Sequence, residues 1–149
     1  MQRARISGVV MPLGVALSGG VHLRLYRGGY RDIHIDSIAG IDLSRSFLLS
    51  FISAALITAL LVVALANPKL LKPAAAAAGI YAAGAIAAYL KTRNGGLLGF
   101  EDTATSTEAV IAKSAELVTL VAAAVVLLGD RLPQSEPARS EPAGAELAA

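Results

Sequence analysis

Three polar side chains that could bind a divalent metal alternate along one short stretch of the chain. They are Asp32, His34 and Asp36, in the run Tyr-Arg-Asp-Ile-His-Ile-Asp. Carboxylate and imidazole groups are common metal ligands. On an extended strand, however, side chains two residues apart are separated by roughly 7 Å, and no turn gathers these three. The favoured interpretation is a solvated strand face without a metal, with His22 as one further candidate across a predicted hairpin.

No pattern typical of an enzyme is present. The chain has no cysteine, which excludes a thiol nucleophile, a disulfide and a zinc finger. There is no G-x-S-x-G sequence, and neither histidine has an evident serine partner. The glycines at 95, 96 and 99 belong to a predicted hairpin and not to a phosphate-binding turn. We therefore expect a non-enzymatic protein without a cofactor.

Six basic residues flank the most apolar part of the chain, and we call them the basic rim. They are Arg24, Arg27, Arg31, Arg45, Lys91 and Arg93. Near an anionic membrane surface each such residue contributes about 1 kcal/mol of binding. The simpler interpretation is general anchoring of the membrane ends, and the sharper one is a pocket for anionic lipid head groups. The net charge of only +2 does not favour nucleic acid as a partner.

Two uncharged segments predict a transmembrane helical hairpin at 47–90. The first, 47–66, is long enough for a hydrocarbon core about 30 Å thick, and the second spans 74–90. The connector between them contains two prolines and two lysines. A hydrophobic content of 55% agrees with a membrane protein. The excess of arginine over lysine indicates a prokaryotic gene, and so a plasma-membrane location.

The second segment carries small residues at every fourth position, and we call them the small-residue ridge. They are Ala75, Gly79, Ala83 and Ala87. Small residues let helices approach closely in lipid. The short connector favours packing of this ridge against 47–66 of the same chain. A homo-oligomer interface is the alternative.

The distribution of basic residues predicts the orientation of this hairpin. Eight basic residues flank its two outer ends, whereas the connector holds only Lys69 and Lys72. The positive-inside rule then places both termini in the cytoplasm.

The flanks of the hairpin predict β-structure. In 21–26 and 30–36 apolar and polar residues alternate, and Gly-Gly pairs at 19–20 and 28–29 are typical of hairpin turns. The turn Asn94-Gly95-Gly96 predicts a further hairpin after the membrane. We therefore expect 1–46 and 91–129 to be two β-containing parts of one domain, and the Pro-rich segment 130–149 to be a disordered tail.

A helix is predicted over 107–128, after an N-cap at Ser106 or Thr107. Lys113 and Glu116 lie at a spacing that allows them to pair. If both count as charges, only 117–128 is uncharged, too short to cross a bilayer. A packed C-terminal helix is preferred, and a third span is the alternative.

The stretches YRDIHIDSIAGIDLSRS and YLKTRNGGLLGFEDTATSTEAVIAKSAELV resemble segments of bacterial PH-like membrane proteins. In one group of these proteins a transmembrane hairpin is inserted within the PH-like domain. The resemblance covers about residues 5–128. It implies an α+β membrane protein: a small antiparallel PH-like β-sheet with a C-terminal helix, interrupted by the two-helix hairpin. It carries over no functional residues.

Two functions follow from these observations. The first is a non-enzymatic integral membrane protein that presents its PH-like domain at the cytoplasmic membrane surface, as a scaffold or binding module. The second is a small three-span helical protein that self-assembles as a pore or filament subunit. The lipid bilayer is the expected partner in both.

Overall fold

The computed structural model describes residues 2–32, 41–98, 101 and 106–129, with side chains described from Ser7 onward. Of these residues, 89% are helical. The long helices are α1 (Gln2–Leu25), α2 (Leu43–Ala66), α3 (Leu71–Arg93) and α4 (Thr107–Leu128). A π-helical turn, η1 (Tyr26–Tyr30), extends α1, and a 3-10 turn, η2 (Pro68–Leu70), precedes α3.

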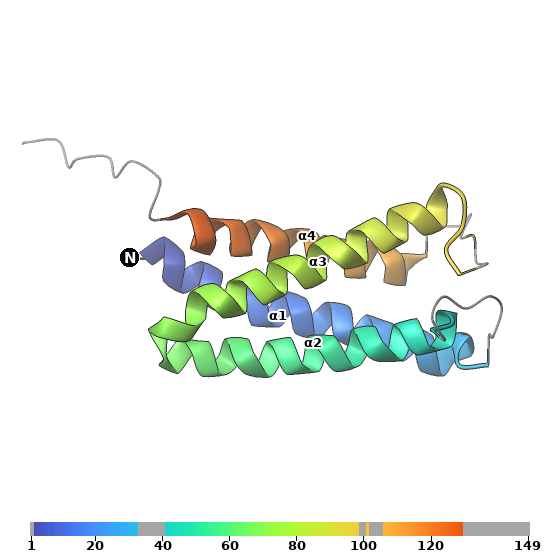
Figure 1. Ribbon diagram of the computed structural model, residues 1–149, viewed down its shortest axis with the longest axis horizontal. Helices are drawn as coiled ribbons and strands as arrows, with labels where there is room; N and C mark the ends of the chain where they lie inside the picture. Colours follow the sequence, from blue (N-terminus) through green and yellow to red (C-terminus); the bar gives the residue numbers. More distant parts are fainter. Residues whose placement is uncertain (1, 33–40, 99–100, 102–105, 130–149) are drawn as a thin grey trace, which may run out of the picture.

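The four long helices form an antiparallel bundle (Figure 1). Each helix packs against the next in the chain, and α1 also packs against α4, which closes the ring. The start of α1, the α2–α3 connector and the end of α4 lie together, and we call this the terminal end. The α1–α2 and α3–α4 connections lie at the opposite end, which we call the loop end (Figure 1).

The expected PH-like sheet is wrong, and so is the α+β fold class. The described residues contain no sheet, and the segment predicted as strands before the membrane forms α1 and η1 as far as Tyr30; the predicted strand residues 33–36 lie outside the described residues. The period-two pattern of 21–26 predicts a strand only where one face meets water. A segment surrounded by lipid must satisfy its backbone hydrogen bonds internally, which a single strand cannot do. Within the described residues, four helices, and not two, are long and apolar enough to cross a membrane.

Two glycines of α1 lie in helix contacts, and one of them, Gly19, belongs to a Gly-Gly pair predicted as a hairpin turn. A Cβ on Gly19 would lie 2.5 Å from the Cβ of Ala54 on α2, and one on Gly14 would lie 3.0 Å from the carbonyl oxygen of Ala115 on α4. These glycines therefore permit close contact with both neighbouring helices. Gly29, with φ 159°, interrupts helical geometry within η1.

The helix ends follow local capping chemistry. The carboxylate of Asp42 accepts a hydrogen bond from the backbone N–H of Arg45 at 2.8 Å, so α2 begins at Leu43, four residues before the predicted start. It ends at Ala66, before Asn67-Pro68, as predicted. The predicted turn at 94–96 is present, with positive φ at Gly95 and Gly96, but it ends α3 instead of joining two strands.

Helix α4 has the predicted bounds. Ser106 is its N-cap, and its hydroxyl accepts from the backbone N–H of Ala109 at 3.1 Å. Lys113 and Glu116 pair as their spacing predicted. The sequence favoured a packed C-terminal helix over a third span because Lys113 and Glu116 were counted as charges that would face lipid. Because they pair within the bundle, the whole 22-residue helix is long and apolar enough to cross.

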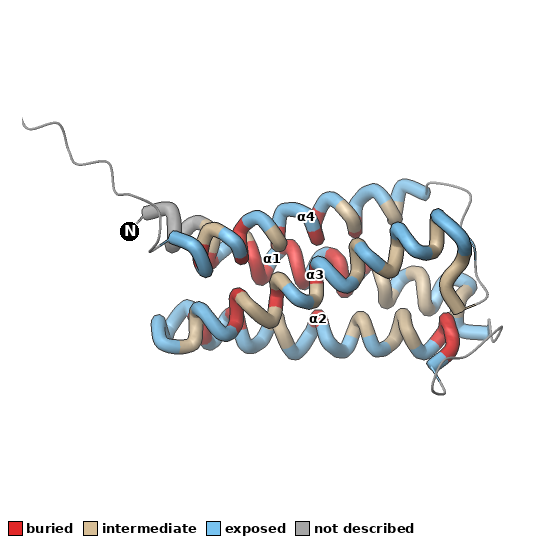
Figure 2. Tube along the Cα trace, turned by 45° about the horizontal axis from the view of Figure 1, so that its top comes forward, coloured by how far each residue is buried: buried red, intermediate tan, exposed pale blue. Residues whose placement is uncertain are grey.

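The bundle is packed with small residues inside and large apolar residues outside. Buried positions face the neighbouring helices, whereas the outer faces are exposed (Figure 2). Ala54, Ala74, Ala75 and Ala78 are among the most buried residues. Leu13, Leu56 and Ile80 are 66–75% exposed, although each is strongly apolar. This arrangement is the reverse of a water-soluble bundle, in which large apolar side chains fill the core.

Candidate functional site

An ion pair lies inside the bundle, near the middle of its length. Lys113 of α4 pairs with the Oε2 atom of Glu116, whose side chain is completely buried. The Oε1 atom of Glu116 accepts a hydrogen bond of 2.7 Å from the hydroxyl of Ser18 on α1. That hydroxyl also lies 3.2 Å from the hydroxyl of Tyr81 on α3. Side chains of α1 and α4 thus contact the carboxylate directly, which offsets the cost of burying it, and α3 joins the network through Tyr81.

Lys113 has contacts besides Glu116. Its Nζ atom donates a hydrogen bond of 3.1 Å to the carbonyl oxygen of Ala85 and lies 5.4 Å from the ring centroid of Tyr89. An aromatic ring at this distance attracts a cation through its face. The ammonium group is therefore held between α3 and α4.

His22 lies one helical turn beyond Ser18. Its Nδ1 atom is 2.9 Å from the carbonyl oxygen of Ser18, which can only accept, so Nδ1 carries a proton. In the neutral ring, Nε2 is then the hydrogen-bond acceptor. The His22 ring lies 5.7 Å from that of Phe47, whose other neighbour is the Tyr30 ring at 4.9 Å.

A cavity of about 170 Å³ adjoins this network on the side of the loop end. All four helices line it, and its lining combines aromatic, hydroxyl and apolar side chains with one ammonium group. The polar and aromatic residues are His22, Tyr30, Ser46, Phe47, Ser50, Tyr89, Thr92, Ser106 and Lys113. Glu116 is not part of the lining. A small molecule entering the cavity would therefore meet Lys113 before it met Glu116.

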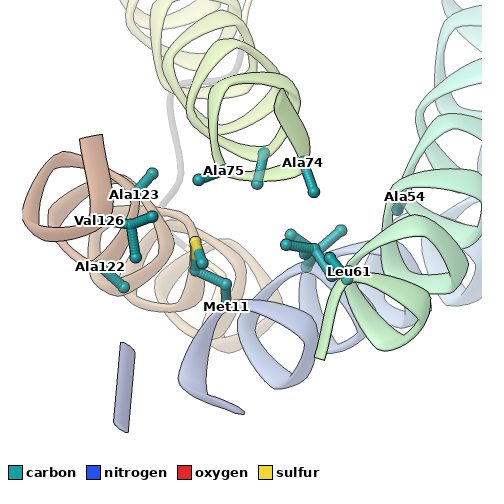
Figure 3. Close-up of a cluster of buried hydrophobic side chains, with 11 residues drawn as sticks. Met11, Ala54, Leu61, Ala74, Ala75, Ala122, Ala123 and Val126 are labelled. Carbon is teal, nitrogen blue, oxygen red and sulfur yellow. The ribbon is translucent and has the colours of Figure 1, made fainter. Parts of the chain in front are cut away.

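The core toward the terminal end is apolar. Met11, Leu61, Ala75 and Ala123 belong to a buried cluster drawn from all four helices (Figure 3). Between this cluster and Glu116, the hydroxyl of Thr119 donates to the carbonyl oxygen of Ala115 in its own helix. Among the described residues, the polar network thus leads inward from the cavity and stops at the apolar cluster.

The structure brings the basic rim to the loop end, where its residues flank the two connections. Arg24 forms an ion pair of 3.3 Å with Glu108 of α4, and Arg27, Arg45 and Lys91 are exposed. The carbonyl oxygen of Arg31 accepts a hydrogen bond of 2.9 Å from the hydroxyl of Ser44. Arg93 is half-buried, and its Nη1 atom has no hydrogen-bond partner among the described residues.

The small-residue ridge of α3 is divided between two environments. Ala75 is fully buried, and a Cβ on Gly79 would lie 3.4 Å from the Cβ of Ala123 on α4. Ala83 and Ala87 are exposed on the outer surface. The first half of the ridge therefore packs inside the bundle and the second half faces outward.

The predicted cluster of Asp32, His34 and Asp36 is described only at Asp32, which is exposed; the other two lie outside the described residues. In the part of the chain that the structure describes, no group of three acidic, histidine or cysteine side chains is placed to hold a metal.

Sequence reasoning recognised the Lys113–Glu116 spacing but assigned Ser18 and Tyr81 no role and placed His22 on a strand. The signal that could have identified them is the presence of ionisable side chains within apolar helices. Such residues usually face the interior of a bundle and find partners there.

No protein-family model matches the chain, and no curated protein or solved structure matches it. What the site does must therefore be argued from its own residues.

Proposed function

We propose that this chain is a non-enzymatic, multi-pass membrane protein that binds a small molecule in the cavity at the loop end of its bundle. The observation that carries this proposal is the cavity itself. It is lined by all four helices, contains the half-buried ammonium group of Lys113 and adjoins the fully buried carboxylate that pairs with it. Ionisable groups within membrane helices are costly and usually serve a function.

The packing supports a membrane location. The outer faces of all four helices expose large apolar side chains, while alanines and glycines fill the contacts between the helices. A helix of 22 residues is about 33 Å long, enough for the hydrocarbon core. The plasma membrane remains part of the proposal.

The shape of the polar network favours binding over conduction. A pore needs polar or water-filled space along its whole length, whereas this network ends at the cluster that contains Met11 and Leu61. A site open at one end and closed at the other suits a ligand that enters and leaves by the same route.

The basic rim around the loop end gives the site its electrostatic surroundings. Its guanidinium and ammonium groups attract anions toward the opening and, in a bilayer, would lie near lipid phosphates. We therefore include anionic lipid head groups among the partners of this end of the bundle.

Thiol labelling tests the cavity, because the chain has no cysteine of its own. Ser50 lines the cavity, whereas Ala78 is fully buried in the apolar cluster. In vesicles, Ser50→Cys should react with a small water-soluble thiol reagent from one membrane side, and Ala78→Cys should not react. An unreactive Ser50→Cys in a folded protein would contradict the proposed open cavity.

Self-assembly is a second candidate, favoured by the outward half of the small-residue ridge. Ala83 and Ala87 are exposed, and nothing lies within 4 Å of a Cβ placed on Gly84. A smooth surface of this kind permits close contact with another helix. Ala83→Cys should then form disulfide-linked dimers in membranes, with Ala78→Cys as the buried control, and an entirely monomeric Ala83→Cys would exclude this interface.

A further inference from the structure

We propose that the cavity binds a small monocarboxylate at Lys113, and that Glu116 takes up one proton when the carboxylate binds. This inference rests on the proposed function, because it assigns a ligand class to the same cavity. Glu116 is the counter-ion of Lys113 in the structure, and we infer that the carboxylate of a bound ligand replaces it in that role.

The position of Lys113 suits it for contact with a ligand. Its ammonium group has three N–H donors, and among the described residues it donates to Glu116 and to the carbonyl oxygen of Ala85. Lys113 lines the cavity, and its side chain is 21% exposed. A carboxylate that enters the cavity can therefore reach the ammonium group without any rearrangement of the helices.

Glu116 lies on the far side of Lys113 from the cavity. Its side chain has no exposed surface, and its second oxygen is held by Ser18. The Glu116 side chain therefore remains in place when the ligand binds, and the site would then hold two carboxylates. A second anion beside one ammonium group would leave a net negative charge in a medium of low dielectric constant, which is strongly unfavourable.

Protonation of Glu116 removes this charge. The carboxylate of Glu116 and one proton become a neutral carboxylic acid, and the positive charge of Lys113 then pairs with the ligand. The total charge of the site is zero before and after binding. The Ser18 hydroxyl can donate or accept, so it can keep its hydrogen bond to either form of Glu116.

Other groups that titrate face this site from two further helices. His22 on α1 lies 3.5 Å from the Ser18 hydroxyl, and Tyr81 and Tyr89 lie on α3. From α2 the cavity receives Ser46, Phe47 and Ser50, which do not titrate in this range, while Asp42 and Arg45 lie at the start of that helix. His22 is the other side chain beside this network whose protonation could give the same signal, and the experiment below separates it from Glu116.

The size and lining of the cavity indicate the ligand class. A volume of about 170 Å³ is roughly that of five or six waters at 30 Å³ each. Tyr30, Phe47 and Tyr89 provide flat apolar surfaces beside the single ammonium group. The basic rim favours an anion over a cation. A single carboxylate on a short apolar or aromatic body fits all three properties.

Isothermal titration calorimetry on the full chain in zwitterionic nanodiscs tests the proposal, with benzoate, acetate and chloride as probes. If binding takes up a proton, the measured heat changes with the ionisation enthalpy of the buffer. We expect benzoate to bind with uptake of about one proton, acetate to bind more weakly with the same uptake, and Lys113→Met to bind neither.

Amino-acid substitutions identify the residue that takes up the proton. Arginine keeps its charge at any accessible pH. Lys113→Arg should therefore retain the uptake through Glu116, whereas the double variant Lys113→Arg/Glu116→Gln should bind benzoate with none and at least tenfold more tightly than Lys113→Arg. His22→Asn should leave the uptake unchanged. Helical circular dichroism and size exclusion confirm the fold of each variant.

Several results would overturn the inference. Equal heats of benzoate binding in two buffers would mean that no proton is taken up. Proton uptake that persists in Lys113→Arg/Glu116→Gln, or disappears in His22→Asn, would mean that Glu116 is not the group that takes it up. Equally strong binding of chloride and benzoate, or no binding of any probe at tens of millimolar, would exclude the proposed ligand class. If Ser50→Cys is nevertheless labelled from water, the cavity stands and only the ligand and its proton are wrong. An unlabelled Ser50→Cys would instead remove the proposed function itself.

Discussion

At the scale of single residues, the molecule depends on how a few polar groups are satisfied inside an apolar bundle. Glu116 receives its hydrogen bonds from two other residues, and each of these has a further partner. A buried ion pair of this kind adds little net stability, because desolvation offsets the attraction between the charges. Removing one partner is costly, however, since the other charge remains buried without compensation.

A double-mutant cycle on Lys113 and Glu116 should show this asymmetry. Lys113→Met alone and Glu116→Gln alone should each lower the free energy of unfolding by roughly 3 kcal/mol, and the double variant by less than about 1 kcal/mol. Denaturation in detergent, followed by circular dichroism, measures all three.

Lys69→Met is the matched control, because Lys69 is exposed in the connector between α2 and α3. It should change the stability by no more than about 0.5 kcal/mol. Additive losses in the double variant would mean that the two side chains do not interact.

At the scale of elements, the glycines of α1 determine how closely its neighbours approach. Gly19 faces Ala54 of α2, whereas nothing lies within 4 Å of a Cβ placed on Gly20. Two adjacent glycines thus have opposite environments, one in a helix contact and one on the outer surface. The same pair had been interpreted as a hairpin turn, because a Gly-Gly sequence by itself has no information about what packs against it.

Gly19→Ala should destabilise the bundle by about 1–3 kcal/mol, because its Cβ would overlap that of Ala54. Gly20→Ala should be neutral or stabilising by up to about 1 kcal/mol, since alanine favours helix. Thermal unfolding in the same detergent compares them.

A second substitution checks the cause. Ala54→Gly removes the methyl group that Gly19→Ala would meet, so the double variant should regain most of the lost stability. Equal effects at Gly19 and Gly20 would show that α1 and α2 do not pack as described.

At the scale of the whole molecule, four candidate spans change the topology expected from two. If all four helices cross the membrane, the number of spans is even, and the two ends of the bundle again lie on one membrane side. The basic residues, however, are redistributed: the six of the rim lie at the loop end, while Lys69 and Lys72 join Arg3 and Arg5 at the terminal end. With Arg131 and Arg139 following α4, the charge difference that favoured cytoplasmic termini disappears.

Single cysteines at three exposed positions test this arrangement. Asp32→Cys and Glu101→Cys report the two connections of the loop end, and Lys69→Cys reports the α2–α3 connector. In vesicles of known orientation, the first two should react with an impermeant reagent from one side and the third from the other. Reaction of Asp32→Cys and Lys69→Cys from the same side would show that α2 does not cross the membrane. If all four helices cross, the side that labels Lys69→Cys is also that of the start of α1; if only α2 and α3 cross, it is the opposite side.

The sequence by itself determined the apolar segments, the end of α2 before Asn67-Pro68, the bounds of α4 and the pairing of Lys113 with Glu116. These depend on local properties: hydrophobicity, capping residues and a spacing of three along one helix. It did not determine that α1 is a helix, because the alternation of apolar and polar residues in 21–26 is compatible with a strand in water and with a helix in a bundle. Only the tertiary structure placed Ser18 against Glu116, 98 residues away, with Tyr81 and His22 beside them. Whether a polar side chain in an apolar helix faces lipid, water or a partner depends on which helices pack together, and that is a property of the assembled bundle.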